Sequence, residues 1–162
     1  MPAVKEQGGK IVAGTFVIAM FLTIMPLPEW LRAFRPDWVA LVLIYWCLAT
    51  PNKVNIGVAW LVGLSIDVLT GTLLGEHALA FGVIAFIAVK LHKQIRVHPP
   101  WQQAISVFVM IALGQLIIVW IKGITGESPH SWAYWAPSVT SALIWPMVFV
   151  LLRGLRRSFR IA

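Results

Sequence analysis

One carboxylate within an apolar hairpin constrains the fold of this chain more than any other feature. Residues 34–79 contain two apolar stretches that are joined by a short turn at residues 51–54. Asp67 is the one charged residue between Val54 and Gly75. An ionisable side chain at the centre of a membrane helix costs about 2.5 to 3.5 kcal/mol on insertion scales, so it normally faces a partner or a cavity. We therefore expect Asp67 to be enclosed.

The composition indicates an integral membrane protein. Of the 162 residues, 59% are hydrophobic and 12% are charged, which is more apolar surface than a soluble domain of this size can bury. Cys47 is the single cysteine, and the four histidines lie at or near the ends of apolar runs, so we expect no internal disulfide, haem, metal or other cofactor. The net charge of +7 comes from Lys and Arg beside hydrophobic ends, which favours anionic lipid over nucleic acid as their partner.

Six apolar stretches are predicted to cross the membrane as helices, in one polytopic domain that covers residues 1–162. Prolines mark several of the ends: Pro36 suits a first helical turn, and the residue before Pro51 disfavours helix. Asn55 is a candidate N-cap for the third span. The expected fold is an all-α membrane bundle with spans at residues 11–25, 37–50, 55–70, 76–91, 102–121 and 137–152.

The boundary between the third and fourth spans has two interpretations. The uncharged run at residues 78–89 reaches only about 18 Å, whereas the hydrocarbon core is about 30 Å thick. The fourth span must therefore include Glu76 and His77, or the two spans share a glycine-rich turn at residues 70–75 that dips into the membrane. Irregular backbone at that depth needs cover by protein or water.

The distribution of Lys and Arg predicts the orientation. Three of these residues, Arg32, Arg35 and Lys122, lie at one set of span ends. Because basic residues favour the cytoplasmic side, both termini are expected in the cytoplasm. The other ten cations lie at the alternate ends: Lys5, Lys10, Lys53, Lys90, Lys93, Arg96, Arg153, Arg156, Arg157 and Arg160. Of these, seven are expected to contact lipid or the cytoplasmic face: Lys90, Lys93, Arg96, Arg153, Arg156, Arg157 and Arg160.

Asp67 has two structural interpretations of about equal weight. It can fix how the third and fourth spans pack or what they bind, or it can cap the amides of the turn at residues 68–71. Gly63, Gly71 and Gly75 lie four or eight residues from Asp67, a small-residue pattern that allows two helices to approach closely. A proton or ion relay is disfavoured because the spans contain no further acid or base.

The remaining polar positions do not form a catalytic constellation. Arg32, Arg35 and Asp37 can form a docking patch on the outer surface, although their residue types favour anchoring at the membrane interface. Glu76 and His77 are interpreted as a solvated turn rather than a catalytic dyad. Candidate structural or docking residues are Arg35, Pro36, Asp37, Asn55, Gly63, Asp67, Gly71 and Gly75.

Several strings in the sequence resemble the rod shape-determining protein MreD family of Gram-negative bacteria. They are FRPDW at 34–38, YW at 45–46, PNKVNIG at 51–57, GLSIDVLTGTLLG at 63–75 and WQQA at 101–104. The resemblance implies a non-enzymatic scaffold of the cell-elongation machinery in the bacterial inner membrane. It implies that MreC is the direct partner, and that MreB, RodA and the partner transpeptidase of RodA belong to the same assembly.

The resemblance also implies a fold similar to the six-helix substrate-binding subunits of vitamin ECF transporters. The alternative function is accordingly a small-molecule or vitamin-binding transporter subunit. Such a subunit needs several polar groups that converge on one pocket, and the predicted spans supply only Asp67, Gln115 and scattered Ser and Thr. The scaffold is therefore the preferred interpretation.

Overall fold

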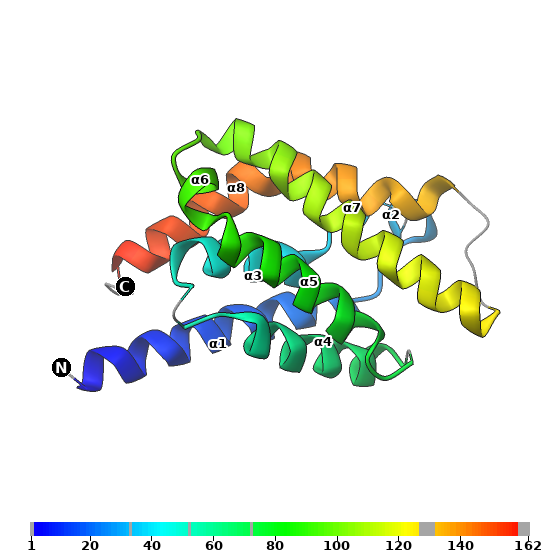
Figure 1. Cartoon of the computed structure of the whole chain (residues 1–162), viewed down its shortest axis with the longest axis horizontal. Coiled ribbons are helices and arrows are strands. Elements are labelled where there is room, and N and C mark those ends of the chain that lie inside the picture. The colour runs from blue at the N-terminus through cyan, green and yellow to red at the C-terminus, as the bar shows by residue number, and fades with distance from the viewer. Residues whose placement is uncertain (1, 33, 52, 72, 127–131, 159–162) are drawn as a thin grey trace.

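The chain folds into a bundle of helices, shown in Figure 1. The computed structural model describes residues 2–32, 34–51, 53–71, 73–126 and 132–158. No strand occurs among these residues, so the all-α prediction is confirmed. The elements are α1 (Pro2–Ile24), α2 (Glu29–Arg32), α3 (Trp38–Ala49), α4 (Ile56–Thr70), α5 (Glu76–Lys90), α6 (His92–Arg96), α7 (Pro100–Thr125), the 3-10 helix η1 (Trp132–Trp135) and α8 (Ala136–Ser158).

Two of the described helices, α7 and α8, are long and apolar enough to cross a membrane. The apolar helices α3 and α4 are shorter, with 12 and 15 residues. At 1.5 Å per residue, α3 extends only about 18 Å, less than the thickness of a hydrocarbon core. The structure thus supports a helical chain with two membrane-length helices, and six crossings stay a prediction.

The bundle has two distinct ends. Figure 1 shows the start of α1, the helix α6 and the end of α8 at one end, which we name the basic end. The turn between α4 and α5 and the end of α7 lie at the other, which we name the turn end (Figure 1). Both termini of the described chain therefore lie at the same end of the bundle.

Helix α3 forms the centre of the bundle. It is apolar around its whole circumference, as expected of a helix that is buried on all sides, and ten of its 12 residues are buried. It packs against α1, α5, α6, α7 and α8. The indole Nε1 of Trp46 donates a hydrogen bond to Thr15 Oγ1 at 2.9 Å, which satisfies the polar atom of a fully buried ring.

The closest packing in the bundle joins α4 to α5. A Cβ atom added at Gly63 would lie 2.4 Å from Ala78 Cα, a contact with backbone that no side-chain rotation can relieve. The small-residue prediction therefore describes Gly63 correctly. Gly71 and Gly75 have different roles, since both lie in the turn with positive φ angles of 71° and 101°.

We predict that Gly63→Ala destabilises the protein, because the added methyl group must push the α4 and α5 backbones apart. Overpacking of this kind typically costs about 1 to 3 kcal/mol. Thermal unfolding in detergent, followed by circular dichroism, measures the loss. Gly82→Ala is the matched control, since a Cβ there meets no atom within 4 Å. Equal stability of the two variants would contradict the close approach.

Candidate functional site

Asp67 lies at the end of α4, and its carboxylate accepts hydrogen bonds from the start of α5. The side chain is fully buried, with an exposed fraction of 0%. Its Oδ2 accepts from the Gly75 amide at 2.8 Å, and its Oδ1 accepts from the His77 amide at 3.0 Å. The Nδ1 atom of His77 also lies 2.7 Å from Oδ1. The first amides of a helix lack partners within the helix, so Asp67 caps α5 from another helix.

The turn that makes this contact possible depends on two glycines. Gly71 ends α4 in the left-handed region, and its amide donates to the Asp67 carbonyl. Gly75 begins α5, also in the left-handed region, and has no side chain that could cap the helix. Residues other than glycine adopt this conformation at a cost. The chain thus reverses within five residues, 71–75, and returns the start of α5 to Asp67.

The hydrogen bonds from Gly75 and His77 lie outside the turn at residues 68–71 that the capping interpretation named. Through them the carboxylate joins α4 to α5. We call this set of contacts the Asp67 joint.

The prediction of a solvated turn at Glu76 and His77 is wrong. Glu76 is buried, with an exposed fraction of 3%, and its Oε1 lies 3.8 Å from the Lys122 ammonium of α7. The His77 side chain bonds to Asp67 and packs edge-on against Phe81. Burial of a carboxylate is costly unless a positive charge lies near it, and Lys122 supplies that charge.

A cavity of about 250 Å³, lined by apolar and polar side chains, lies beside the Asp67 joint. Its lining residues come from residues 35–37 and from seven helical elements: α1, α3, α4, α5, α7, η1 and α8. Its polar lining includes Thr23, Arg35, Asp37, Thr70, His77, Gln115, Lys122 and Tyr134. The cavity therefore collects residues that are up to 114 positions apart in the sequence, from Thr23 to Pro137, and it lies at the turn end.

Two of the predicted docking residues hold helix ends together at this cavity. The Arg35 guanidinium donates to the carbonyls of Thr23 and Met25 at the end of α1, where the helix dipole is negative and free carbonyls need donors. Asp37 caps α3 by accepting from the Ala40 amide at 3.2 Å. These contacts favour an intramolecular role over an outer docking patch, and Pro36 lies between them in the cavity wall.

Gln115 and Tyr134 form a reciprocal pair across α7 and η1. The amide Nε2 of Gln115 donates to the Tyr134 carbonyl at 3.0 Å, and the Tyr134 hydroxyl donates to the Gln115 carbonyl at 3.1 Å. Burial, with the charges of Glu76 and Asp37, raises the pKa of Tyr134 above its ordinary value, so the phenol keeps its proton. The sequence pattern did not single out Tyr134, although aromatic residues next to a predicted span are typical of a segment at the membrane interface.

The other predicted residues do not meet at this cavity. Asn55 caps α4 at the opposite end, where its Oδ1 accepts from the Gly57 and Val58 amides. Among the basic residues, Lys93, Arg96, Arg153 and Arg157 are exposed, Arg156 is half-buried, and Lys90 lies over the Phe86 ring at 5.6 Å. Arg160 lies outside the described residues.

The arrangement at the turn end can bind and position, but it shows no paired nucleophile and base. No group of three or more His, Cys, Asp or Glu in the described part of the chain could hold a metal ion. Two buried acceptor atoms, Glu76 Oε1 and Gln115 Oε1, have no hydrogen-bond partner among the described residues. The contacts described at this end are hydrogen bonds and charge pairs.

We predict that Asp67→Ala lowers stability, because it leaves the partly buried Gly75 and His77 amides at the start of α5 without their acceptor. Each such donor costs about 1 to 3 kcal/mol. Asp67→Asn should lose less, since its amide oxygen can still accept one of these bonds. Thermal unfolding of the purified protein in detergent measures both losses.

Ser65→Ala is the matched control for these variants. Ser65 lies two residues earlier on an exposed face of α4, and its hydroxyl bonds only within the helix, to the Leu61 carbonyl. It should unfold near the wild-type temperature. An Asp67→Ala protein that unfolds together with this control would contradict the joint.

Comparison with known proteins agrees with the resemblance seen in the sequence. The family model described as rod shape-determining protein MreD matches residues 8–155. A rod shape-determining protein MreD of Haemophilus influenzae is 35% identical over 146 residues, which cover 90% of this chain and 90% of that protein. No solved structure matches, so the likeness to vitamin-transporter subunits stays a prediction. The chain belongs to the rod shape-determining protein MreD family.

Proposed function

We propose that the protein is a non-catalytic scaffold of the cell-elongation complex in the bacterial inner membrane. It crosses the membrane several times with both termini in the cytoplasm. It binds MreC and thereby connects MreB filaments to RodA and to the partner transpeptidase of RodA. Family membership supports a role in rod-shape determination, and the observation that carries the scaffold role is an apolar groove between α1 and α8.

This groove, which we name the α1/α8 groove, has a volume of about 290 Å³. Helix α3 forms its floor with Trp38 and Val42, and α1 and α8 form its walls. The rim residues Ile18 and Leu151 are 62% and 64% exposed. Its lining is almost wholly apolar: Thr15, Ile18, Ala19, Leu22, Trp38, Val42, Met147, Val148, Leu151, Leu152 and Leu155.

A single transmembrane helix is the partner that suits this groove. Helices associate in membranes through close van der Waals packing, and small residues let the backbones approach. Thr15 and Ala19 supply such positions on α1, one helical turn apart. MreC is expected to cross the membrane once, so we propose that its transmembrane helix lies in the α1/α8 groove.

A second candidate function is a small-molecule-binding subunit. The buried Glu76 Oε1 and Gln115 Oε1 atoms favour it, because they lack hydrogen-bond partners among the described residues. The cavity beside the Asp67 joint, however, has a volume of about 250 Å³. This volume is below the range of about 300 to 1,000 Å³ that is typical of ligand pockets. Thermal stabilisation of the purified protein by a metabolite would favour this second function over the scaffold.

We predict that photocrosslinking from the groove captures MreC. A photoreactive amino acid placed at Ile18 or at Leu151 should crosslink to MreC in living cells, because both side chains lie on the rim of the α1/α8 groove. Immunoblotting for MreC detects the adduct. The same photoreactive residue at Val109 is the matched control, since Val109 is 57% exposed on α7 and does not line the groove.

Three outcomes distinguish contact with MreC at the groove, contact at the α7 face and no contact. Adducts from both groove positions but not from Val109 support the proposed docking. Adducts from Val109 alone would move the MreC contact to the α7 face. A complete lack of MreC adducts from all three positions, with each variant present at the wild-type level, would contradict the scaffold contact.

A further inference from the structure

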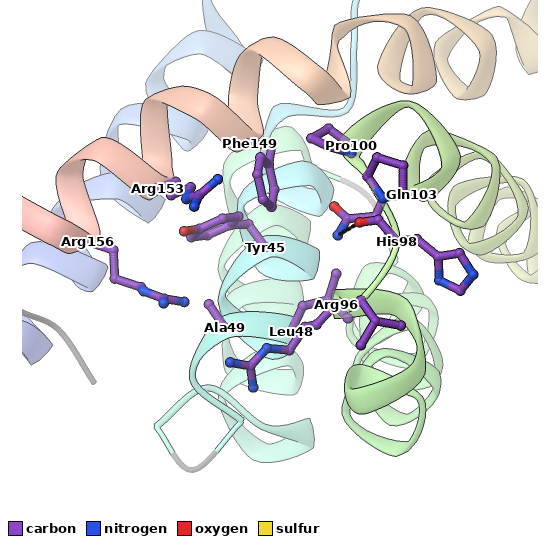
Figure 2. Close-up of a pocket in the computed structure, with 12 residues that line it drawn as sticks. Tyr45, Leu48, Ala49, Arg96, His98, Pro100, Gln103, Phe149, Arg153 and Arg156 are labelled. Atoms are coloured by element: carbon purple, nitrogen blue, oxygen red, sulfur yellow. Dashed lines mark hydrogen bonds between the residues drawn. The ribbon is translucent and has the colours of Figure 1, made fainter.

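Besides the cavity at the Asp67 joint, another cavity lies at the basic end of the bundle. The proposed scaffold role does not use it. Its volume is about 470 Å³. Figure 2 shows Arg153 and Arg156 of α8 beside Tyr45 and Arg96 of α6 nearer Leu48 and Ala49, with the ring of His98 directed away from these three arginines. We name this cavity the basic pocket.

The charged residues that line the basic pocket are all basic. Its lining contains three arginines and no Asp or Glu. Within the described part of the chain, no carboxylate lies at salt-bridge distance from Arg96, Arg153 or Arg156. Like charges that converge on one cavity repel each other, and an anion between them removes that cost. The pocket therefore favours a negatively charged ligand.

The wall that carries two of the arginines is held by aromatic packing. The Phe149 ring lies edge-on to Tyr45 at 5.8 Å between centroids. The Arg153 guanidinium lies over the Phe149 ring, 5.9 Å from its centroid. Tyr45 itself is 3% exposed and belongs to the central helix α3. The cations of α8 are thus placed against a rigid part of the core.

Gln103 holds the opposite wall in place. It is 2% exposed, and its Nε2 donates to the carbonyls of Ile95 and His98, which fixes the connection between α6 and α7. Its Oε1 accepts from the Trp145 indole at 3.1 Å, which ties this connection to α8. A binding site gains affinity when its groups are positioned before the ligand arrives, and this network supplies such positioning.

The start of α7 adds positive potential to the same cavity. Pro99 and Pro100 line the pocket, and no side chain caps the first turn of α7. The amino-terminal end of a helix carries a partial positive charge that attracts anions. This 26-residue helix therefore acts in the same direction as the three arginines.

We propose that the basic pocket binds the phosphate group of an anionic ligand. Guanidinium groups bind phosphate oxygens through paired hydrogen bonds, and three arginines line this pocket. The apolar part of the lining, which includes Leu48 and Phe149, accommodates the hydrocarbon next to the phosphate of a phospholipid headgroup. Basic pockets between membrane helices are a known setting for such headgroups. Inorganic phosphate carries the same chemistry and is the other source of the group.

Ligand-dependent thermal unfolding tests this site. The purified full chain in a phosphate-free detergent receives short-chain phosphatidylglycerol, inorganic phosphate or the matching diacylglycerol without phosphate. We expect stabilisation by a phosphate-bearing probe and none by diacylglycerol. The triple variant carries Arg96→Gln, Arg153→Gln and Arg156→Gln. In this variant, the concentration of the phosphate-bearing probe that gives half of the full stabilisation should rise about tenfold or more. Arg156→Gln alone provides the test if the triple variant does not fold.

The matched control removes three charges outside the pocket, through Lys90→Gln, Lys93→Gln and Arg157→Gln, and should keep the wild-type half-saturation. Stabilisation by phosphatidylglycerol alone identifies a lipid headgroup, and equal stabilisation by inorganic phosphate identifies the free anion. Equal weakening in both triple variants would show diffuse attraction and overturn the site. A response to an acidic peptide, with none to either phosphate probe, would overturn it as well.

Discussion

The structure depends on how the first amides of α5 are satisfied. Backbone groups at the start of a helix need acceptors, and a hydrocarbon environment offers no water to supply them. The Asp67 carboxylate fills this need from the neighbouring helix, at 2.8 Å to the Gly75 amide and 3.0 Å to the His77 amide. The same contact fixes the short turn, the close approach at Gly63 and the position of Glu76 opposite Lys122. A single acidic residue therefore organises the turn end.

The two ends of the bundle have opposite chemistry. At the turn end, Glu76 pairs with Lys122. The Arg35 guanidinium there donates to the Thr23 carbonyl at the end of α1. At the basic end, three arginines line one pocket, and none of them lies at salt-bridge distance from a carboxylate among the described residues. Cations without such a partner are available to an anionic ligand. This contrast underlies the proposals of phosphate binding at the basic end and of protein contact at the α1/α8 groove.

The sequence predicted the features that depend on local chemistry. The helix signals at Pro51 and Asn55 act over a few residues, and an acid within an apolar run is costly wherever the run lies. Pro36, expected in a first helical turn, instead precedes the Asp37 cap of α3. The sequence did not predict the partners of Asp67, because they depend on the left-handed conformations of Gly71 and Gly75 in the turn. Nor did it predict the bond from the Asp37 amide to Ser141 Oγ at 2.9 Å. These residues lie 104 positions apart, and only the packing of α3 on α8 brings them together.

The most direct test of the Asp67 joint is hydrogen–deuterium exchange at the start of α5 in protein that is reconstituted into lipid. The account predicts that the Gly75 and His77 amides exchange as slowly as amides in the middle of α3, because a buried carboxylate accepts from both. The Gly126 amide, which donates to the Gly123 and Lys122 carbonyls at the exposed end of α7, supplies the reference for a hydrogen-bonded amide that is open to water. Exchange of Gly75 and His77 at the rate of Gly126 would contradict the account.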